Sequence, residues 1–169
     1  VGGGADGIKT ACDANYPNNA RSWMIYGPFS LRDAVAAEML AKVWVYTELD
    51  NDMLCLAASR DARTFNGWCF SGYSDGWVDE RLDLSNVYQL GNLLGENNIY
   101  VALAFISNGS VTRPHQGAYA DNVVVRKGVV AAAAAGGAAA DAAVASDAAP
   151  ASGDLAPAGL LAVSVRDET

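Results

Sequence analysis

Apolar and polar residues alternate in short runs between residues 22 and 127, and this pattern predicts strands. The runs are rich in Val, Ile, Tyr, Trp and Phe, and Gly, Asn, Asp and Ser separate them. The predicted strands span residues 22–26, 36–47, 53–59, 64–71, 77–84, 99–107 and 118–126. Short strands with short connections and no alternating long helices predict an all-β fold, an antiparallel β-sandwich of the jelly-roll or immunoglobulin type.

The segment around residues 31–48 allows two interpretations. Two alternating sets of side chains run along it: Met39, Ala41, Val43 and Val45 in one, and Leu40, Lys42, Trp44 and Tyr46 in the other. They fit one long strand with two partly buried faces. The alternative is a helix over residues 31–45, because residues 33–42 are rich in helix formers. The unbroken Val-Trp-Val-Tyr-Thr that follows favours the strand. Residues 85–97, with three leucines, predict a helical turn.

The two ends of the chain have a different composition. Residues 1–21 are rich in turn formers and predict an extended lead-in to the sandwich domain of residues 22–127. Residues 128–157 form a low-complexity arm of Ala, Gly, Pro, Ser and Asp, which cannot bury enough apolar surface to fold alone. Residues 158–169 then predict a short strand, whose apolar residues are Leu160, Leu161, Val163 and Val165.

A terminal strand of this kind has two ordinary explanations. It is the first strand of a following domain, or it pairs with a sheet edge of its own chain or of a neighbouring copy. We expect pairing with a neighbour.

The charge balance limits the partners. The net charge is −8, from 11 Lys and Arg against 19 Asp and Glu, and the basic residues form no cluster. A phosphate-binding surface needs such a cluster, so the sequence argues against nucleic acid and anionic membranes. No apolar run is long enough to cross a bilayer, so no membrane insertion is expected. The absence of an initial Met and of a basic-then-apolar leader suits a mature, exported chain.

The cysteines predict one disulfide. Cys55 and Cys69 lie nearly symmetrically about the predicted turn at residues 60–64, so they face each other if the flanking strands form a hairpin. Cys12 would then be unpaired or joined to another molecule.

Catalysis is not expected. A serine hydrolase would need a histidine beside an activated serine, but the sequence has one histidine, His115, and no Gly-x-Ser-x-Gly motif. One His and three scattered Cys do not have the spacing of zinc ligands. A glycosidase would need two carboxylates across a cleft. The candidates are Glu48, Asp50 and Asp52 in an acidic turn, where charge is usually solvated, and Asp79, Glu80 and Asp83 on a later strand.

Aromatic residues are the alternative source of function, through stacking on sugar rings. Most aromatic residues at alternating strand positions belong to a core. Trp68, Tyr73 and Trp77 lie in the glycine-rich stretch 67–77 and are the best candidates for an exposed carbohydrate-binding site.

Several segments resemble a family of secreted bacterial β-sandwich modules, which are appended to immune inhibitor A-type peptidases and large surface proteins and are more distantly similar to MAM-like jelly rolls. The similar segments are Ser22-Trp-Met-Ile-Tyr-Gly-Pro-Phe-Ser-Leu31, Trp44-Val-Tyr-Thr-Glu-Leu-Asp-Asn-Asp52, Ala58-Ser-Arg-Asp61, Phe65-Asn-Gly67, Ser71-Gly72, Gly76-Trp77, Leu82-Asp-Leu-Ser85, Val101-Ala-Leu-Ala-Phe105 and Gly117-Ala-Tyr-Ala-Asp-Asn-Val123. The resemblance covers about residues 11–127. It implies an extracellular or cell-surface location and a binding or structural role without catalysis.

Calcium is the expected ion, because the loops offer the hard oxygen ligands that it prefers. Related jelly rolls often carry an acidic residue at the start of the last strand, which makes Asp121 the first candidate ligand. Asp13, Glu48, Asp50 and Asp52 could complete its shell.

Together these features predict a structural subunit of an extracellular filament or surface assembly. In it, the terminal strand of one copy would add to the sheet of the next copy, giving a homopolymer. The alternative prediction is a carbohydrate-binding or adhesive module of a larger secreted protein, with glycans as partners.

Overall fold

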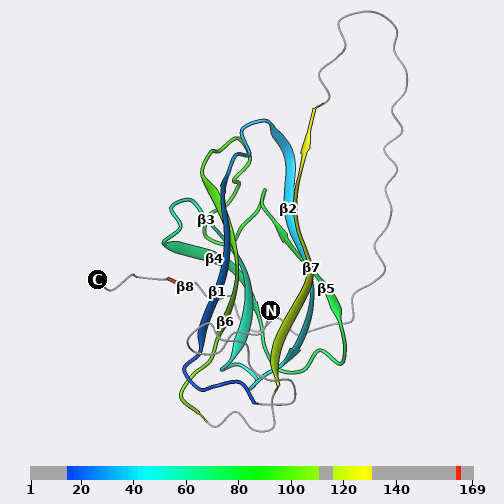
Figure 1. Ribbon diagram of the computed structural model, residues 1–169. Helices are drawn as coiled ribbons and strands as arrows, with labels where there is room; N and C mark the ends of the chain where they lie inside the picture. Colours follow the sequence, from blue (N-terminus) through cyan, green and yellow to red (C-terminus); the bar gives the residue numbers. More distant parts are fainter. Residues whose placement is uncertain (1–14, 111–115, 131–162, 165–169) are drawn as a thin grey trace, which may run out of the picture.

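The computed structural model describes residues 15–110, 116–130 and 163–164, and within them the chain is entirely β, with no helix. The strands are β1 (Arg21–Phe29), β2 (Ala34–Tyr46), β3 (Met53–Ser59), β4 (Thr64–Phe70), β5 (Val78–Asp83), β6 (Ile99–Ile106), β7 (Gly117–Val129) and β8 (Val163–Ser164). Two antiparallel sheets pack against each other (Figure 1). The expected all-β, antiparallel sandwich is therefore confirmed.

The larger sheet has the strand order β1-β6-β3-β4-β8, and the smaller has the order β5-β2-β7. We call the smaller one sheet B and the larger one sheet A. Every paired strand runs antiparallel to its neighbour. The short loop after β2 carries the chain from sheet B to sheet A, and the segment after β4 carries it back to β5.

The core between the sheets follows from the alternation of side chains along each strand. On β2 the inward set is Ala37, Met39, Ala41, Val43 and Val45, all nearly inaccessible to solvent. They pack against residues of the facing strands, which include Leu54, Leu56, Leu82, Val101 and Leu103. The outward set on β2 therefore lies on the solvent side of sheet B.

Two local expectations have opposite outcomes. Residues 34–46 form the long strand β2, as the continuous β-branched and aromatic run favoured, so the helical alternative is excluded. The helical turn expected at residues 85–97 is wrong. This segment forms turns joined by a bridge between Val87 and Gly91, and Gln89, Gly91 and Gly95 all have positive φ, which a helix does not allow. Its apolar residues Val87 and Leu93 are buried in the core.

Sheet A also carries an apolar layer on the side away from sheet B. Cys55 and Ala57 of β3 alternate with its core residues, and both are buried together with Phe65 of β4 and Ala104 of β6. The Trp23 ring of β1 lies 5.5 Å from the Phe65 ring, across the two intervening strands. Small side chains in those strands let the two large rings meet, and β3 is consequently buried on both faces.

Candidate functional site

A group of aromatic side chains lies at one end of the outer face of sheet B. We call it the aromatic belt, and its members are Trp44, Tyr46, Tyr73, Trp77 and Tyr119. The ring centroids of Trp44 and Tyr119 are 5.3 Å apart, and those of Tyr46 and Tyr73 are 5.1 Å apart. Trp44 and Tyr46 contact each other edge to face at 6.2 Å. These contacts join the rings of Trp44, Tyr46, Tyr73 and Tyr119 into one aromatic surface from residues distant in sequence.

Strand register sets the two sides of the aromatic belt. Trp44 of β2 is directly opposite Tyr119 of β7, so both side chains emerge on the same face. Val78, the first residue of β5, is opposite Val43 and turns toward the core. Trp77 precedes Val78, and alternation places it on the outer face beside the position of Trp44.

A loop brings Tyr73 onto the end of β2. The N–H groups of Thr47 and Ser74 donate to the carbonyls of Gly72 and Val45, and the N–H of Val45 donates to the Ser74 hydroxyl at 3.0 Å. These bonds form a bridge that sets Tyr73 against Tyr46. Gly72 turns the chain here with φ of 85°, a conformation that costs glycine little.

The aromatic belt is accessible and has polar neighbours. Tyr73 is 55% exposed and Trp77 is 54% exposed. The Tyr73 hydroxyl donates to Asp75, and this bond raises the pKa of Tyr73. The next outward position of β2 is Lys42, which forms a 2.8 Å ion pair with Asp79 of β5. Exposed rings flanked by fixed polar groups can contact a ligand that has an apolar face and a polar edge, as a sugar ring does.

The three residues predicted from the sequence to bind carbohydrate do not lie together. Tyr73 and Trp77 belong to the aromatic belt, but Trp68, which is 38% exposed, lies on β4 of sheet A. Trp44, Tyr46 and Tyr119 were not predicted as site residues, because alternating aromatics usually form a core. For Trp44 and Tyr46, the signal that could have found them is Lys42, which shares their alternating set and marks it as the solvent-facing one.

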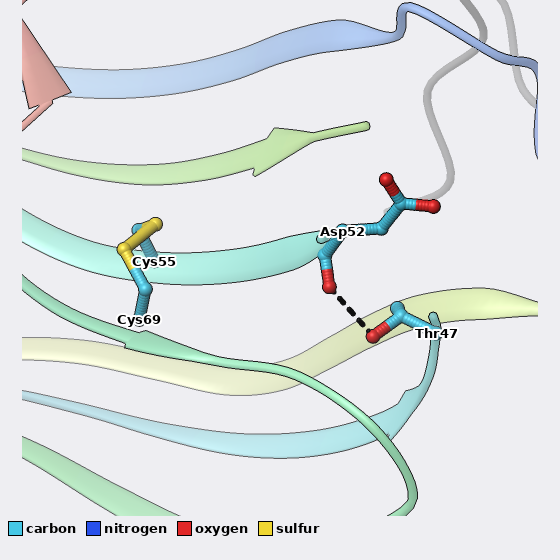
Figure 2. Close-up of a disulfide and its surroundings, with 4 residues drawn as sticks. All are labelled: Thr47, Asp52, Cys55 and Cys69. Atoms are coloured by element: carbon cyan, nitrogen blue, oxygen red, sulfur yellow. Dashed lines mark hydrogen bonds between the residues drawn. A yellow bond between two sulfur atoms is a disulfide. The ribbon is translucent and has the colours of Figure 1, made fainter. Parts of the chain in front are cut away.

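At the same end of the sandwich, the loop after β2 is held by a buried carboxylate. Asp52 is fully buried, and its Oδ2 accepts a 2.5 Å hydrogen bond from the Tyr16 hydroxyl. Its Oδ1 accepts from the N–H of Asn108 at 2.7 Å. Figure 2 shows its main-chain oxygen accepting from Thr47 while the carboxylate points away. Burial and the bond to Asp52 raise the pKa of Tyr16, so its proton stays in place.

The five predicted calcium ligands do not form one shell. Asp121 lies opposite Lys42 on the face of sheet B. Lys42 is five residues, or roughly 17 Å, along the strand from the start of the loop that carries Glu48, Asp50 and Asp52. Asp13 lies outside the described residues. Among the residues described, no three His, Cys, Asp or Glu side chains are grouped to hold a metal.

Among the described members of that set, Glu48 has a buried carboxylate oxygen without a hydrogen-bond donor. Its Oε1 accepts a 3.2 Å hydrogen bond from Asn51, whereas its Oε2 is buried without any hydrogen-bond partner. Both Asp52 oxygens already have donors, so Asp52 acts here as a structural acceptor. Calcium stays a prediction, and Glu48 is its best-supported ligand.

Cys55 and Cys69 occupy directly opposite positions of the β3–β4 hairpin. A disulfide joins them, as Figure 2 shows, with their Cα atoms 4.0 Å apart. Cys12 lies outside the described residues. The disulfide sits in the buried outer layer of sheet A, beside Ala104 and Trp23.

The strand β8 pairs with β4 at the edge of sheet A, with Val163 opposite Phe65 and Ser164 opposite Thr64 (Figure 1). The sheet edge that β8 occupies in the structure belongs to its own chain. The other residues predicted for assembly, Leu160, Leu161 and Val165, lie outside the described residues.

One titratable residue is in an unusual place. Glu80 of β5 is opposite Ala41 and shares the inward side of its strand with Val78 and Leu82. Burial, with a smaller contribution from the charge of Asp79, raises the pKa of Glu80 to about 7. An inward carboxylate on an edge strand discourages pairing with a further strand. Asp79 and Glu80 point to opposite faces and do not form a catalytic pair.

Neither the protein-family models nor the curated proteins gave a match to this chain. The resemblance to secreted bacterial sandwich modules therefore rests on the sequence segments alone. In the part of the chain that the structure describes, there is no helix of the length and apolarity that a membrane span needs.

Proposed function

We propose that this protein is a carbohydrate-binding module of a secreted or cell-surface protein and that it holds its ligand on the aromatic belt. The supporting observation is the belt itself: five rings from strands β2 and β7 and from the loop before β5, on the solvent side of sheet B. Burying such rings beneath a ligand gains apolar contact, while Lys42, Asp79 and Asp75 offer hydrogen bonds to hydroxyl groups.

An extracellular location agrees with the Cys55–Cys69 disulfide, since such bonds persist in oxidising compartments. The acidic net charge of −8 agrees with a ligand other than nucleic acid. The role is binding without catalysis.

The test compares two exposed tryptophans on a glycan array and then by calorimetry with the best oligosaccharide found. Trp77→Ala removes a ring of the aromatic belt, and Trp68→Ala removes an exposed ring of sheet A. We expect Trp77→Ala to weaken binding roughly tenfold or more, which corresponds to about 1.4 kcal/mol, and Trp68→Ala to leave it unchanged. Equal affinities of wild type and Trp77→Ala, or an array without binding, would reject the proposal.

The second proposal is self-assembly through the edge of β4, which is favoured by the pairing of β8 with that edge. Backbone hydrogen bonds would be the same if the strand came from another copy, so exchange of residues 158–169 between copies would build a filament or surface assembly. The partners would then be copies of this chain.

Light scattering across a concentration series tests this assembly. The full chain should form oligomers, and deletion of residues 155–169 should leave monomers. A full chain that stays monomeric at every concentration, or oligomers that survive the deletion, would contradict the proposal.

A further inference from the structure

The outer face of sheet B contains a hollow at the end opposite the aromatic belt. Its volume is about 390 Å³. The residues that line it come from β2, the end of β5 and the end of β7, and they include Ala36, Glu38, Arg81, Asp83, Arg126 and Gly128. Small residues leave the space open: a Cβ added to Gly128 would meet its nearest atom only at 3.8 Å, on Ala36. Long arginine side chains form the walls.

One carboxylate fixes both arginines. Glu38 of β2 accepts the Nε–H of Arg81 at Oε2 and the Nε–H of Arg126 at Oε1. The register explains this arrangement. Arg126 is directly opposite Glu38 on β7, and Arg81 lies on β5 two residues from Asp83, which is opposite Glu38. Burial alone would raise the pKa of Glu38, but the hydrogen bonds from Arg126 and Arg81 hold it below its usual range. Glu38 therefore stays charged and holds both guanidinium groups in place.

The arginines keep further donors for a ligand. The Glu38 side chain is only 15% exposed, whereas those of Arg81 and Arg126 are 59% and 64% exposed. Nη2 of Arg81 donates to Asp83 at 3.3 Å. Within the described residues, three guanidinium NH2 groups have no hydrogen-bond acceptor: both Nη groups of Arg126 and Nη1 of Arg81. A planar guanidinium with free, positioned N–H groups is suited to a carboxylate, which it binds through two parallel hydrogen bonds.

The local charge selects the kind of anion. Arg81 and Arg126 are balanced by Glu38 and Asp83, and Lys127 at the rim is paired with Asp33. The site thus offers oriented donors without a strong positive field, in a chain of net charge −8. The whole protein would repel a polyphosphate or a densely sulfated chain more strongly than a uronic-acid chain, which carries at most one carboxylate for each sugar unit.

We propose that this hollow binds the carboxylate of a uronic-acid unit, and that the glycan ligand is an acidic polysaccharide whose neighbouring units lie on the aromatic belt. This inference rests on the proposed carbohydrate-binding function. Trp44 and Glu38 are six residues apart on the same side of β2, which is about 20 Å. A saccharide of several units can therefore reach both places along one flat face.

The first experiment probes the hollow alone, with a monosaccharide. Sodium glucuronate is titrated while NMR follows the Nε–H signals of Arg81 and Arg126, whose bonds to Glu38 slow exchange with water. Glucose and sodium acetate at equal ionic strength are the controls. We expect saturable shifts with glucuronate and none with glucose. A lack of saturation, or an equal response to acetate, would overturn the proposal.

The second experiment uses variants and an oligosaccharide. Arg126→Gln removes the free donors, Arg126→Lys keeps the charge but loses the planar fork, and Arg21→Gln removes one charge on the exposed start of β1 in sheet A. With tetragalacturonate, we expect both Arg126 variants to bind roughly tenfold more weakly or worse, and Arg21→Gln to bind like the wild type. The methyl ester of the same tetramer should bind all four proteins equally.

The two proposals fail in different ways. If Trp77→Ala weakens saccharide binding while Arg126→Gln binds acid and ester like the wild type, the aromatic belt stands and the uronate site is refuted. If glucuronate shifts the arginine signals but no saccharide depends on Trp77, the hollow binds a uronate without the belt, and the extended acidic ligand is refuted. Thermal melting of each variant verifies that it is folded.

Discussion

The inward carboxylate of Glu80 predicts an unusual dependence of stability on pH. Burial raises the pKa of Glu80 from 4.5 to about 7 in the folded protein. The folded chain therefore holds a proton over a pH range where the unfolded chain has already lost it. The stability associated with Glu80 is full below about pH 4.5 and is lost as the pH rises through about 7. Glu80→Gln should remove this dependence, because glutamine does not titrate.

The magnitude follows from the two pKa values. The pKa of Glu80 is 4.5 in the unfolded chain and about 7 in the folded chain. At about 1.36 kcal/mol for each pKa unit, this difference changes the free energy of unfolding by roughly 3.4 kcal/mol. The edge strand leaves Glu80 partly accessible, so solvent screening reduces the effect, and we expect roughly 1 to 2 kcal/mol. Relative to the wild type, Glu80→Gln should gain that much stability between about pH 4.5 and 8.

Urea unfolding, followed by tryptophan fluorescence at a series of pH values, measures this gain. The matched control is Asp79→Asn, which removes the neighbouring charge from the outer face of the same strand. Its stability difference from the wild type should change with pH much less than that of Glu80→Gln, because the charge of Asp79 makes only the smaller contribution to the raised pKa of Glu80. A difference between Glu80→Gln and the wild type that does not change with pH would refute the reasoning, as would an equal pH response of Asp79→Asn.

Four further predictions concern the framework around the site. Gly67→Ala should lower the free energy of unfolding, measured by urea titration, by about 3 kcal/mol or more, because its Cβ would lie 2.0 Å from the Leu56 carbonyl oxygen. Gly128→Ala should leave that free energy nearly unchanged, since no atom would lie closer than 3.8 Å. Equal losses for the two variants would contradict the clash at Gly67. Tyr16→Phe leaves a buried Asp52 oxygen without its donor and should cost about 2 kcal/mol; an unchanged unfolding midpoint would show that this bond contributes nothing. Replacing both Cys55 and Cys69 by Ala opens a link between residues 14 apart and should cost about 3 kcal/mol, which calorimetry at matched pH can test. Calcium should raise the melting temperature over that in EDTA, and Glu48→Gln should abolish the increase; identical melting curves with and without calcium would reject a calcium site.

The sequence by itself determined the strands and the sheet type. Alternation along residues 34–46 and the β-branched and aromatic runs set each strand, because a strand with one buried face must repeat every two residues. The near-symmetric placement of Cys55 and Cys69 about a turn likewise indicated their pairing. Local patterns failed at residues 85–97, where left-handed turns and burial of Val87 and Leu93 outweigh helix propensity.

Only the tertiary structure decided which residues meet. Nothing local shows that Tyr119 lies beside Trp44, or that a loop brings Tyr73 to Tyr46, because these contacts depend on strand register and on which sheet each strand joins. The same holds for Glu38, whose two arginine partners lie 43 and 88 residues away in the sequence. The sequence contained the aromatic and charged side chains of sheet B, and the pairing of β5, β2 and β7 assembled them into one face.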